Sequence, residues 1–170
     1  MKKLLFITIL LLTYSINSFA DNAHFIDFSK VLNASKPGAE AQKKLKEKFD
    51  VESKKYKKSE EEIRKEEKEI ISQKKDISPE DYQKKVKALR AKVAQLQKNK
   101  KNSFENIAKS RRDAKEELLK AVNPIIKSHM EEKNIRMVLD KKAVVLGDTT
   151  LEITDQIIAI LNKKLPSLKN

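Results

Sequence analysis

The longest regular pattern in the sequence is a pair of helical segments, residues 39–75 and 79–132, separated by one short break. In the first segment the large apolar residues recur every seven positions, as in one seam of a coiled coil: Phe49, Tyr56, Ile63 and Ile70. The companion seam positions are polar: Glu52, Ser59 and Glu66. In the second segment the spacing alternates between four and three: Tyr82, Val86, Leu89, Val93 and Leu96. This pattern predicts an antiparallel helical hairpin in which only the second helix carries a full apolar seam.

The break between the two segments, near residues 76–79, has the signals of a helix start. Ser78 can act as the N-cap, and Pro79 occupies the first helical position. At 1.5 Å per residue, the first helix would be roughly 55 Å long and the second roughly 80 Å. The surplus of the second helix is rich in apolar residues: Leu118, Leu119, Val122, Ile125, Ile126 and Met130. The strongest packing is therefore predicted at the base of the hairpin and not at its tip.

Short apolar runs on both sides of the hairpin predict strands. Residues 24–28 are short and rich in aromatic residues, as in a strand, and Ser29 can then cap a brief helix. Residues 135–139 and 143–146 predict two strands of a β-hairpin, followed by a last helix that Thr154 caps and that ends at Pro166. The predicted fold class is thus α+β: a long antiparallel, coiled-coil-like helical hairpin (39–132) projects from a small β-rich body (21–38 and 133–170).

The apolar residues of the body exceed what three short strands and two short helices can bury within one chain. A small sheet also has exposed edges. Association of several chains would cover both. The residues expected to form this oligomerisation body are Phe25, Ile26, Phe28, Met137, Val138 and Val145.

The first twenty residues have the pattern of a secretory signal peptide. Lys2 and Lys3 precede the apolar run 4–12, and the small residues Ser18 and Ala20 suit a signal peptidase. We expect cleavage after Ala20. An uncleaved membrane anchor is the less favoured alternative, because the run is shorter than the roughly 20 residues that span a bilayer. The chain contains no cysteine, which excludes a disulfide framework.

The chain is strongly basic, with a formal net charge of +13. Residues 82–112 contain eleven Lys or Arg and a single acidic residue, Glu105. Six of these cations recur at intervals of eleven residues and so return to nearly the same side of a helix. We call them the basic stripe: Lys87, Arg90, Lys98, Lys101, Lys109 and Arg112.

The basic stripe has two interpretations, a solvated face and a binding surface. A helix that needs only solubility mixes both signs of charge, as residues 47–69 do. We therefore favour a binding role toward anionic partners: acidic polypeptide segments, the phosphates of lipopolysaccharide or an anionic membrane surface.

The C-terminal block resembles a known family. Val138-Leu139-Asp140, Ala143-Val144-Val145 and Glu152-Ile153-Thr154-Asp155 are similar to the closing strands and helix start of the Skp/OmpH family of periplasmic chaperones, with Glu152 in place of an Asp. The order of elements matches over essentially the whole sequence after residue 20, whereas the hairpin matches only in length and charge. The resemblance implies a periplasmic homotrimer whose hairpins enclose a cavity that holds unfolded outer-membrane proteins without ATP.

Two functions remain open from the sequence: an ATP-independent holdase chaperone, and an exported coiled-coil adaptor or spacer that docks one fixed partner. Nucleic-acid compaction, suggested by the pI near 9.7, is disfavoured by the signal peptide. An enzyme is disfavoured as well. The two histidines, His24 and His129, fall on a strand and near a helix end, and the sequence contains no phosphate-binding Gly-rich loop. We expect no catalytic residue, cofactor or metal site.

Overall fold

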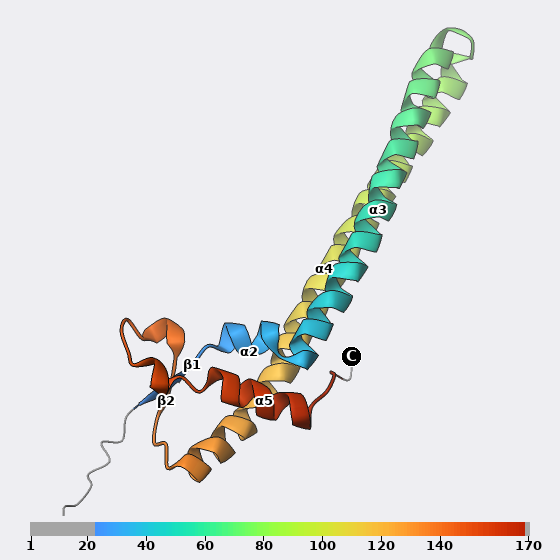
Figure 1. Ribbon diagram of the computed structural model, residues 1–170. Coiled ribbons are helices and arrows are strands. Elements are labelled where there is room, and N and C mark those ends of the chain that lie inside the picture. The colour runs from blue at the N-terminus through green and yellow to red at the C-terminus, as the bar shows by residue number, and fades with distance from the viewer. Residues whose placement is uncertain (1–22, 169–170) are drawn as a thin grey trace, which may run out of the picture.

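The computed structural model describes residues 23–168 and shows a long helical hairpin that stands on a small body (Figure 1). The hairpin consists of α3 (Lys36–Ser72) and α4 (Pro79–Lys133), joined through the 3-10 turn η1 (Gln73–Lys75). The body contains β1 (His24–Ile26), α2 (Phe28–Ala34), β2 (Val138–Asp140), η2 (Lys141–Ala143), η3 (Thr149–Leu151) and α5 (Thr154–Lys164). The fold is mostly helical with one small sheet, so the hairpin was predicted correctly but the body is less β-rich than expected.

The expected signal peptide, residues 1–20 with cleavage after Ala20, lies outside the described residues. Within residues 23–168, none of the helices has the long apolar stretch that a bilayer span requires.

The two hairpin helices begin at side-chain caps. The hydroxyl of Ser78 accepts a hydrogen bond from the backbone N–H of Asp81 at 3.1 Å, which confirms the predicted cap of α4. The first helix begins at Lys36 and not at residue 39, because Ser35 caps it by accepting from the N–H of Gly38 at 3.3 Å. Pro37 lies in the first turn, where its missing N–H costs nothing.

The sheet has a different topology from the predicted β-hairpin. β1 and β2 pair in parallel, from His24 opposite Val138 to Ile26 opposite Asp140. The chain leaves β1, runs through the whole helical hairpin and then returns to β2. Phe28 is also not in a strand but opens α2, which Asp27 caps in place of Ser29 by accepting from the N–H of Lys30 at 2.8 Å.

Two aspartates explain why the predicted strand 143–146 does not form. The Asp140 carboxylate accepts from the N–H of Lys142 at 2.9 Å, and the Asp148 carboxylate accepts from the N–H of Thr150 at 2.8 Å. Such local bonds satisfy the backbone within a turn and compete with a strand ladder. The backbone bond from Thr150 also lowers the pKa of Asp148. The chain therefore forms η2 at the start of this segment and η3 after it, and residues 144–146 lie in the irregular connection between them.

The core lies at the base, where α5 packs against both α2 and the end of α4 (Figure 1). Val31, Val122, Ile157 and Leu161 are completely buried in it. Leu118 and Ile125, from the apolar end of α4, join the same core, which confirms the predicted strong packing at the base.

This core forms within a single chain. The expectation that Phe25 and Ile26 need other chains for their burial was therefore wrong, since both are already buried. Leu161 is buried as well, whereas Met137 and Val145 remain exposed.

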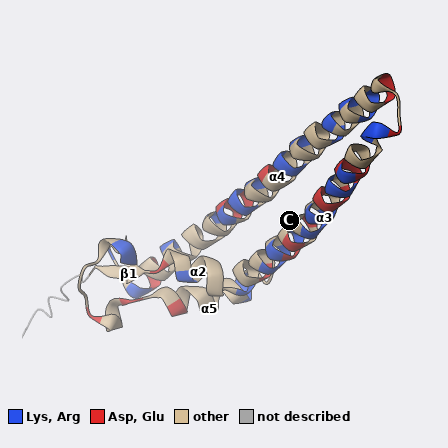
Figure 2. Ribbon diagram, turned by 90° about the horizontal axis from the view of Figure 1, so that it is seen from above, with Lys and Arg blue, Asp and Glu red and all other residues tan. Residues whose placement is uncertain are grey.

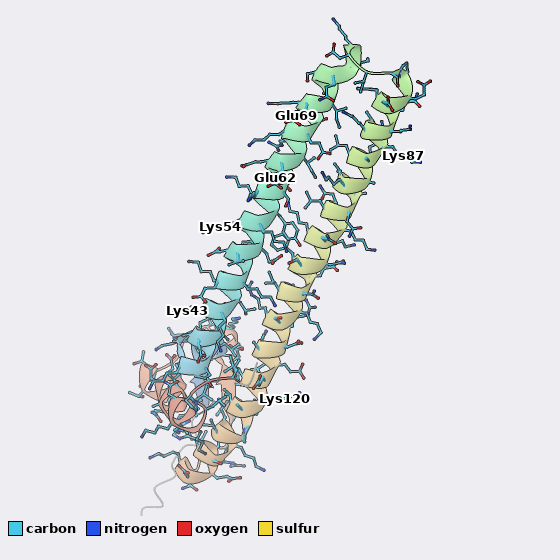
Figure 3. The ribbon with its side chains drawn as sticks, turned by 90° about the vertical axis from the view of Figure 1, so that its right-hand side faces the viewer. Lys43, Lys54, Glu62, Glu69, Lys87 and Lys120 are labelled. Atoms are coloured by element: carbon cyan, nitrogen blue, oxygen red, sulfur yellow. The ribbon has the colours of Figure 1, made fainter. Side chains whose placement is uncertain are left out.

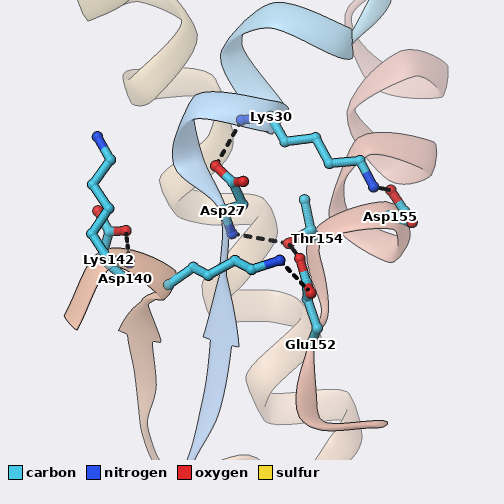
Figure 4. A network of polar contacts seen from close by, with 8 residues as sticks. Asp27, Lys30, Asp140, Lys142, Glu152, Thr154 and Asp155 are labelled. Atoms are coloured by element: carbon cyan, nitrogen blue, oxygen red, sulfur yellow. Dashed lines mark hydrogen bonds and ion pairs between the residues drawn. The ribbon is translucent and has the colours of Figure 1, made fainter. Parts of the chain in front are cut away.

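A polar network ties the start of α2 to the start of α5 (Figure 4). The backbone N–H of Asp27 donates to the Thr154 hydroxyl at 2.9 Å, and that hydroxyl donates to Glu152 at 2.7 Å. Thr154 is thus the first residue of α5 and does not cap it as predicted. Lys141 donates to Glu152 at 2.9 Å, and this bond, followed by the one from Thr154, lowers the pKa of the Glu152 carboxyl.

Gly38 allows the closest approach between α2 and α3. A Cβ atom at this position would lie 1.9 Å from the carbonyl oxygen of Leu32 and 2.9 Å from the Ser35 hydroxyl oxygen. Because a backbone carbonyl cannot move aside as a side chain can, only glycine fits here.

We expect Gly38→Ala to lower the free energy of unfolding by roughly 1–3 kcal/mol, because the added methyl group must displace the backbone of α2. Helix propensity alone predicts the opposite sign, a gain of up to about 1 kcal/mol. Urea unfolding followed by circular dichroism measures the difference. Gly147→Ala is the control, since its Cβ would meet only side chains, at 3.2 Å from Val144 and 3.4 Å from Phe25. A Gly38→Ala variant at least as stable as the parent would contradict the packing argument.

Candidate functional site

Polar contacts connect α3 and α4 along most of the hairpin (Figure 3). From the body toward the tip they are Ser103 to Glu52 (2.7 Å), Tyr56 to the carbonyl oxygen of Asn99 (3.0 Å), Lys100 to Glu60 (2.6 Å), Lys92 to Glu66 (2.5 Å) and Lys85 to Gln73 (2.5 Å). Glu52 and Glu66 occupy polar positions of the predicted half seam. These positions therefore bond across the hairpin instead of packing.

Two of these contacts shift the titration of a carboxyl group. The Ser103 hydroxyl is the largest influence on Glu52, and the Lys100 ammonium is the largest on Glu60; both lower the pKa of the carboxyl group. Glu52 and Glu60 are only half-buried, so solvent still screens their charges and each contact contributes modestly to stability.

Lys and Arg residues recur along α4 (Figure 2), and two sets of them lie on different sides of the helix. Lys85, Lys92 and Lys100 reach across to α3. The six residues of the basic stripe are all exposed, and at about 100° per residue they lie roughly 150° around the helix from the first set. Lys87, which belongs to the stripe, projects from the side of α4 turned away from α3 (Figure 3). The structure therefore brings the predicted stripe together on one outer face.

Most of the stripe is unpaired. Lys101 lies 3.8 Å from Glu105, and Lys109 lies 2.6 Å from Asp113. Lys87, Arg90 and Lys98, together with Arg112, have no ion-pair or hydrogen-bond partner among residues 23–168. An unpaired exposed cation retains its full capacity to attract an anion.

Of the hollows between the helices of the hairpin, two lie where Phe49, Ile71 and Val93 are exposed. The first, which we call the middle hollow, has a volume of about 660 Å³ and is lined by Leu45, Phe49, Phe104, Ile107, Arg111 and Arg112, among others. The second, the tip hollow, has a volume of about 460 Å³ and is lined by Ile63, Ile70, Ile71, Val86, Arg90 and Val93, among others. In the middle hollow the Phe49 and Phe104 ring centroids are 5.3 Å apart. Each hollow thus combines apolar side chains with at least one guanidinium group.

Sequence reasoning did not find these hollows. It placed Phe49 and Val93 in apolar seams, but Phe49 is 48% exposed, Val93 is 36% exposed and Ile71 is 58% exposed. The half seam was the available signal: a helix whose alternate seam positions are polar cannot cover the apolar residues of its partner.

The residues predicted to form the oligomerisation body differ in burial. Phe25 and Ile26 are buried in the chain's own core, and Phe28 and Val138 are half-buried. Met137 and Val145 are exposed. Two neighbours in sequence, Leu139 and Leu146, are exposed as well, so the large exposed hydrophobic residues of the body all fall in residues 137–146 in the part that the structure describes.

The described residues offer no cluster suited to metal binding. They contain no group of three or more His, Cys, Asp or Glu side chains that could hold a metal ion. His129, which the sequence places near a helix end, is buried, and its Nε2 atom has no hydrogen-bond partner in residues 23–168.

Comparisons with known proteins agree with this geometry. A family model described as "Outer membrane protein (OmpH-like)" matches residues 23–161. Among solved structures, the chain is similar to a candidate outer membrane chaperone (OmpH-like) from Caulobacter crescentus CB15, with a TM-score of 0.80 and 18% sequence identity over 87% of this chain and 88% of that one. At this identity the likeness shows the fold alone. The comparison with curated proteins gave no match.

We expect acidification to weaken the hairpin through Glu52 and Glu60. Because both pKa values lie below the ordinary value of 4.5, the contacts stabilise the hairpin fully above that value, and the contribution disappears as the pH falls through the lowered pKa values. Urea midpoints measured between about pH 6 and pH 3 should therefore fall less steeply in a Glu52→Gln/Glu60→Gln variant than in the parent.

The matched control removes two carboxylates that make no side-chain contact across the hairpin, as Glu61→Gln/Glu69→Gln. The control should keep the parent's pH dependence. If the Glu52→Gln/Glu60→Gln variant loses stability as steeply as the parent, these contacts do not support the hairpin.

Proposed function

This chain belongs to the OmpH-like family of outer membrane proteins, and from that premise we propose that it is an ATP-independent holdase chaperone for unfolded outer-membrane proteins. Members of the family are chaperones and not enzymes, which confirms the expectation that the chain is not an enzyme. The proposed location is the periplasm, supported by the signal-peptide pattern of residues 1–20.

The observation that carries the proposal is that the hairpin leaves part of its apolar surface uncovered: Leu45, Ile70 and Ile107 are buried, but other large apolar residues are not. Polar contacts such as Tyr56 to Asn99 and Lys100 to Glu60 hold α3 against α4. Phe49, Ile71 and Val93 consequently remain exposed beside hollows that the chain itself does not fill. A holdase needs weak apolar contacts at several points, because it binds chains of many sequences and must release them.

The alternative function, an adaptor that docks one fixed partner helix, is less well supported. Such a partner is usually held in a continuous apolar groove, with anchors at i, i+3, i+4 and i+7. The polar contacts of Glu60 and Tyr56 interrupt the apolar surface between the middle hollow and the tip hollow. This arrangement suits separate contacts with an irregular chain.

We further propose that the protein is a homotrimer assembled through the body. Met137, Leu139 and Val145 are exposed. Contact with another chain would remove this apolar surface from water. Among the described residues β2 pairs only with β1, so its other edge is free for association. One hairpin would then project from each chain and contribute to a shared cavity.

The basic stripe has a supporting role in this proposal. Its unpaired cations would attract acidic segments of a client chain, and lipopolysaccharide or an anionic membrane surface would be a second class of partner. Exposed charges act over about 8 Å at physiological ionic strength. Their main effect would therefore be on the rate of capture.

Light scattering of a denatured porin diluted into buffer without nucleotide tests the holdase function. We expect the mature protein to suppress aggregation at one trimer per porin, because each hairpin offers apolar hollows and unpaired cations. An adaptor for a fixed partner would leave the porin to aggregate, and that outcome would exclude the proposed function.

The same assay defines the role of the basic stripe. Replacing Lys87, Arg90, Lys98 and Lys101 with Gln should slow porin capture and weaken the binding of anionic vesicles, with the oligomer mass unchanged. The control removes equal charge from exposed positions of α3, as Lys54, Lys57, Lys65 and Lys68 to Gln. Should the stripe variant capture porin at the parent rate in low salt, the stripe is only a solvated face.

A deletion tests assembly through the body. The rings of Phe49 and Phe104 lie side by side, so a short turn can bridge the ends left when residues 49–104 are removed. We expect the shortened protein to remain trimeric by light scattering, and we expect Leu139→Lys/Val145→Lys in the full chain to be monomeric. A monomeric deletion product would refute assembly through the body.

A further inference from the structure

The middle and tip hollows are lined by equivalent positions of α4. Val86, Leu89 and Val93 in the tip hollow correspond to Phe104, Ile107 and Arg111 in the middle hollow, each eighteen residues further along. Eighteen residues are five full turns of an α-helix, so both sets face the same way. The two hollows therefore open on the same side of the hairpin, about 27 Å apart along its length.

α3 shows the same relation. Leu45 and Phe49 line the middle hollow, and Ile63 and Glu67, eighteen residues later, line the tip hollow. The lining positions of the two hollows are thus eighteen residues apart in both helices. The equivalence of the hollows therefore holds for the hairpin as a whole.

The opposite side of the hairpin has a different chemical character. Its two hollows, of about 420 and 260 Å³, are lined in part by charged and amide groups: Lys44, Lys48 and Asp113 in one, and Glu62, Glu66 and Gln95 in the other. Lys44 is paired with Glu40 at 2.8 Å, and Glu66 with Lys92 at 2.5 Å. The hairpin thus has an apolar side, on which Phe49, Ile71 and Val93 are exposed, and an opposite side whose charges are largely paired.

The charges on the apolar side favour an anionic occupant. Arg90 borders the tip hollow, and Arg111 and Arg112 border the middle hollow; none of the three has a partner within residues 23–168. No carboxylate lines the middle hollow, and Glu67 is the single acidic residue that lines the tip hollow. The occupant should therefore combine apolar groups with negative charge.

We propose that the two hollows form one two-point binding site for an extended segment of unfolded polypeptide. One large apolar side chain of the segment enters each hollow, and acidic side chains next to it meet Arg90, Arg111 and Arg112. This proposal rests on the holdase function and adds the form of the segment that is bound.

The spacing of the hollows sets the length of that segment. An extended chain advances about 3.4 Å per residue, so about 27 Å corresponds to roughly eight residues. Side chains an even number of residues apart lie on the same face of an extended chain. A transmembrane β-strand has about 9–11 residues and alternates in polarity, so one such strand spans both hollows with its apolar face.

A labelled peptide and the full mature protein test the site by fluorescence anisotropy. The peptide has fourteen residues, with two phenylalanines eight positions apart, each followed by aspartate, and serine or threonine elsewhere. A second peptide of the same composition has its phenylalanines four positions apart. We expect the first peptide to bind roughly tenfold more tightly, because only its two side chains reach both hollows together.

Filling the hollows should abolish this preference. Ala94 and Ala108 are exposed and line the tip and middle hollows, so Ala94→Gln/Ala108→Gln occupies both with little effect on the helix. We expect the variant to bind both peptides equally weakly. The control, Ser59→Gln/Ser110→Gln, fills the hollows of the opposite side and should bind as the parent does.

A charge variant gives an independent test if the filled variant folds poorly. Arg90→Gln/Arg111→Gln/Arg112→Gln alters only exposed side chains, and it should lose roughly tenfold in affinity at low salt while aspartate-free peptides are unaffected. Unchanged affinity in either folded variant overturns the proposal.

Two further outcomes would also overturn it. Loss of binding to phosphatidylglycerol vesicles with unchanged peptide binding would identify a lipid site, and a change in oligomer mass would identify a contact between copies. Porin aggregation separates these failures from failure of the holdase function: if the parent suppresses aggregation and the peptides show no preference, only the two-point site is wrong.

Discussion

The hairpin is held in part by polar contacts at positions where a coiled coil would use apolar side chains, although Leu45, Ile70 and Ile107 are buried. Tyr56 bonds to the carbonyl oxygen of Asn99, and Glu52 and Glu60 bond to Ser103 and Lys100. These bonds hold two long helices together without covering Phe49 or Val93. Each exposed pair contributes little, so the middle and tip of the hairpin are held more weakly than the base, where the core of α4, α2 and α5 excludes water. The polar contacts therefore account both for the uncovered apolar surface of the hairpin and for its modest local stability.

The helix α4 links that surface to the body, because one continuous helix supplies both. Its first part faces α3, and its last part carries Leu118, Val122 and Ile126 into the core. The orientation of the hairpin is thus fixed by packing at the base and does not require a second anchor. The polar network of Asp27, Thr154 and Glu152 then holds the start of α2 against the start of α5. Met137, Leu139, Val145 and Leu146 remain exposed.

Local signals in the sequence predicted the elements whose causes are local. The cap at Ser78 and the side of α4 that carries Lys87 and Lys98 follow from helix geometry, which a short segment specifies. The pairing of β1 with β2 joins segments on either side of the whole hairpin, and no local pattern specifies it. The prediction of a strand at residues 143–146 was wrong because it did not take into account that Asp140 and Asp148 cap turns on either side of this segment. The hollows were missed because they depend on how α3 and α4 face each other.

A protein that exposes apolar side chains for others to bind must also avoid binding itself. Large continuous apolar patches on a soluble protein promote self-association. Here the exposed residues of the hairpin are divided between two separate hollows, and unpaired arginines stand beside each of them. Hairpins that carry the same charge repel one another, so the cations that attract an acidic segment also keep the hollows of neighbouring hairpins apart. The excess of positive charge on α4 thus supports both solubility and capture. The two roles can be separated by comparing variants that remove equal charge from exposed positions of α4 and of α3.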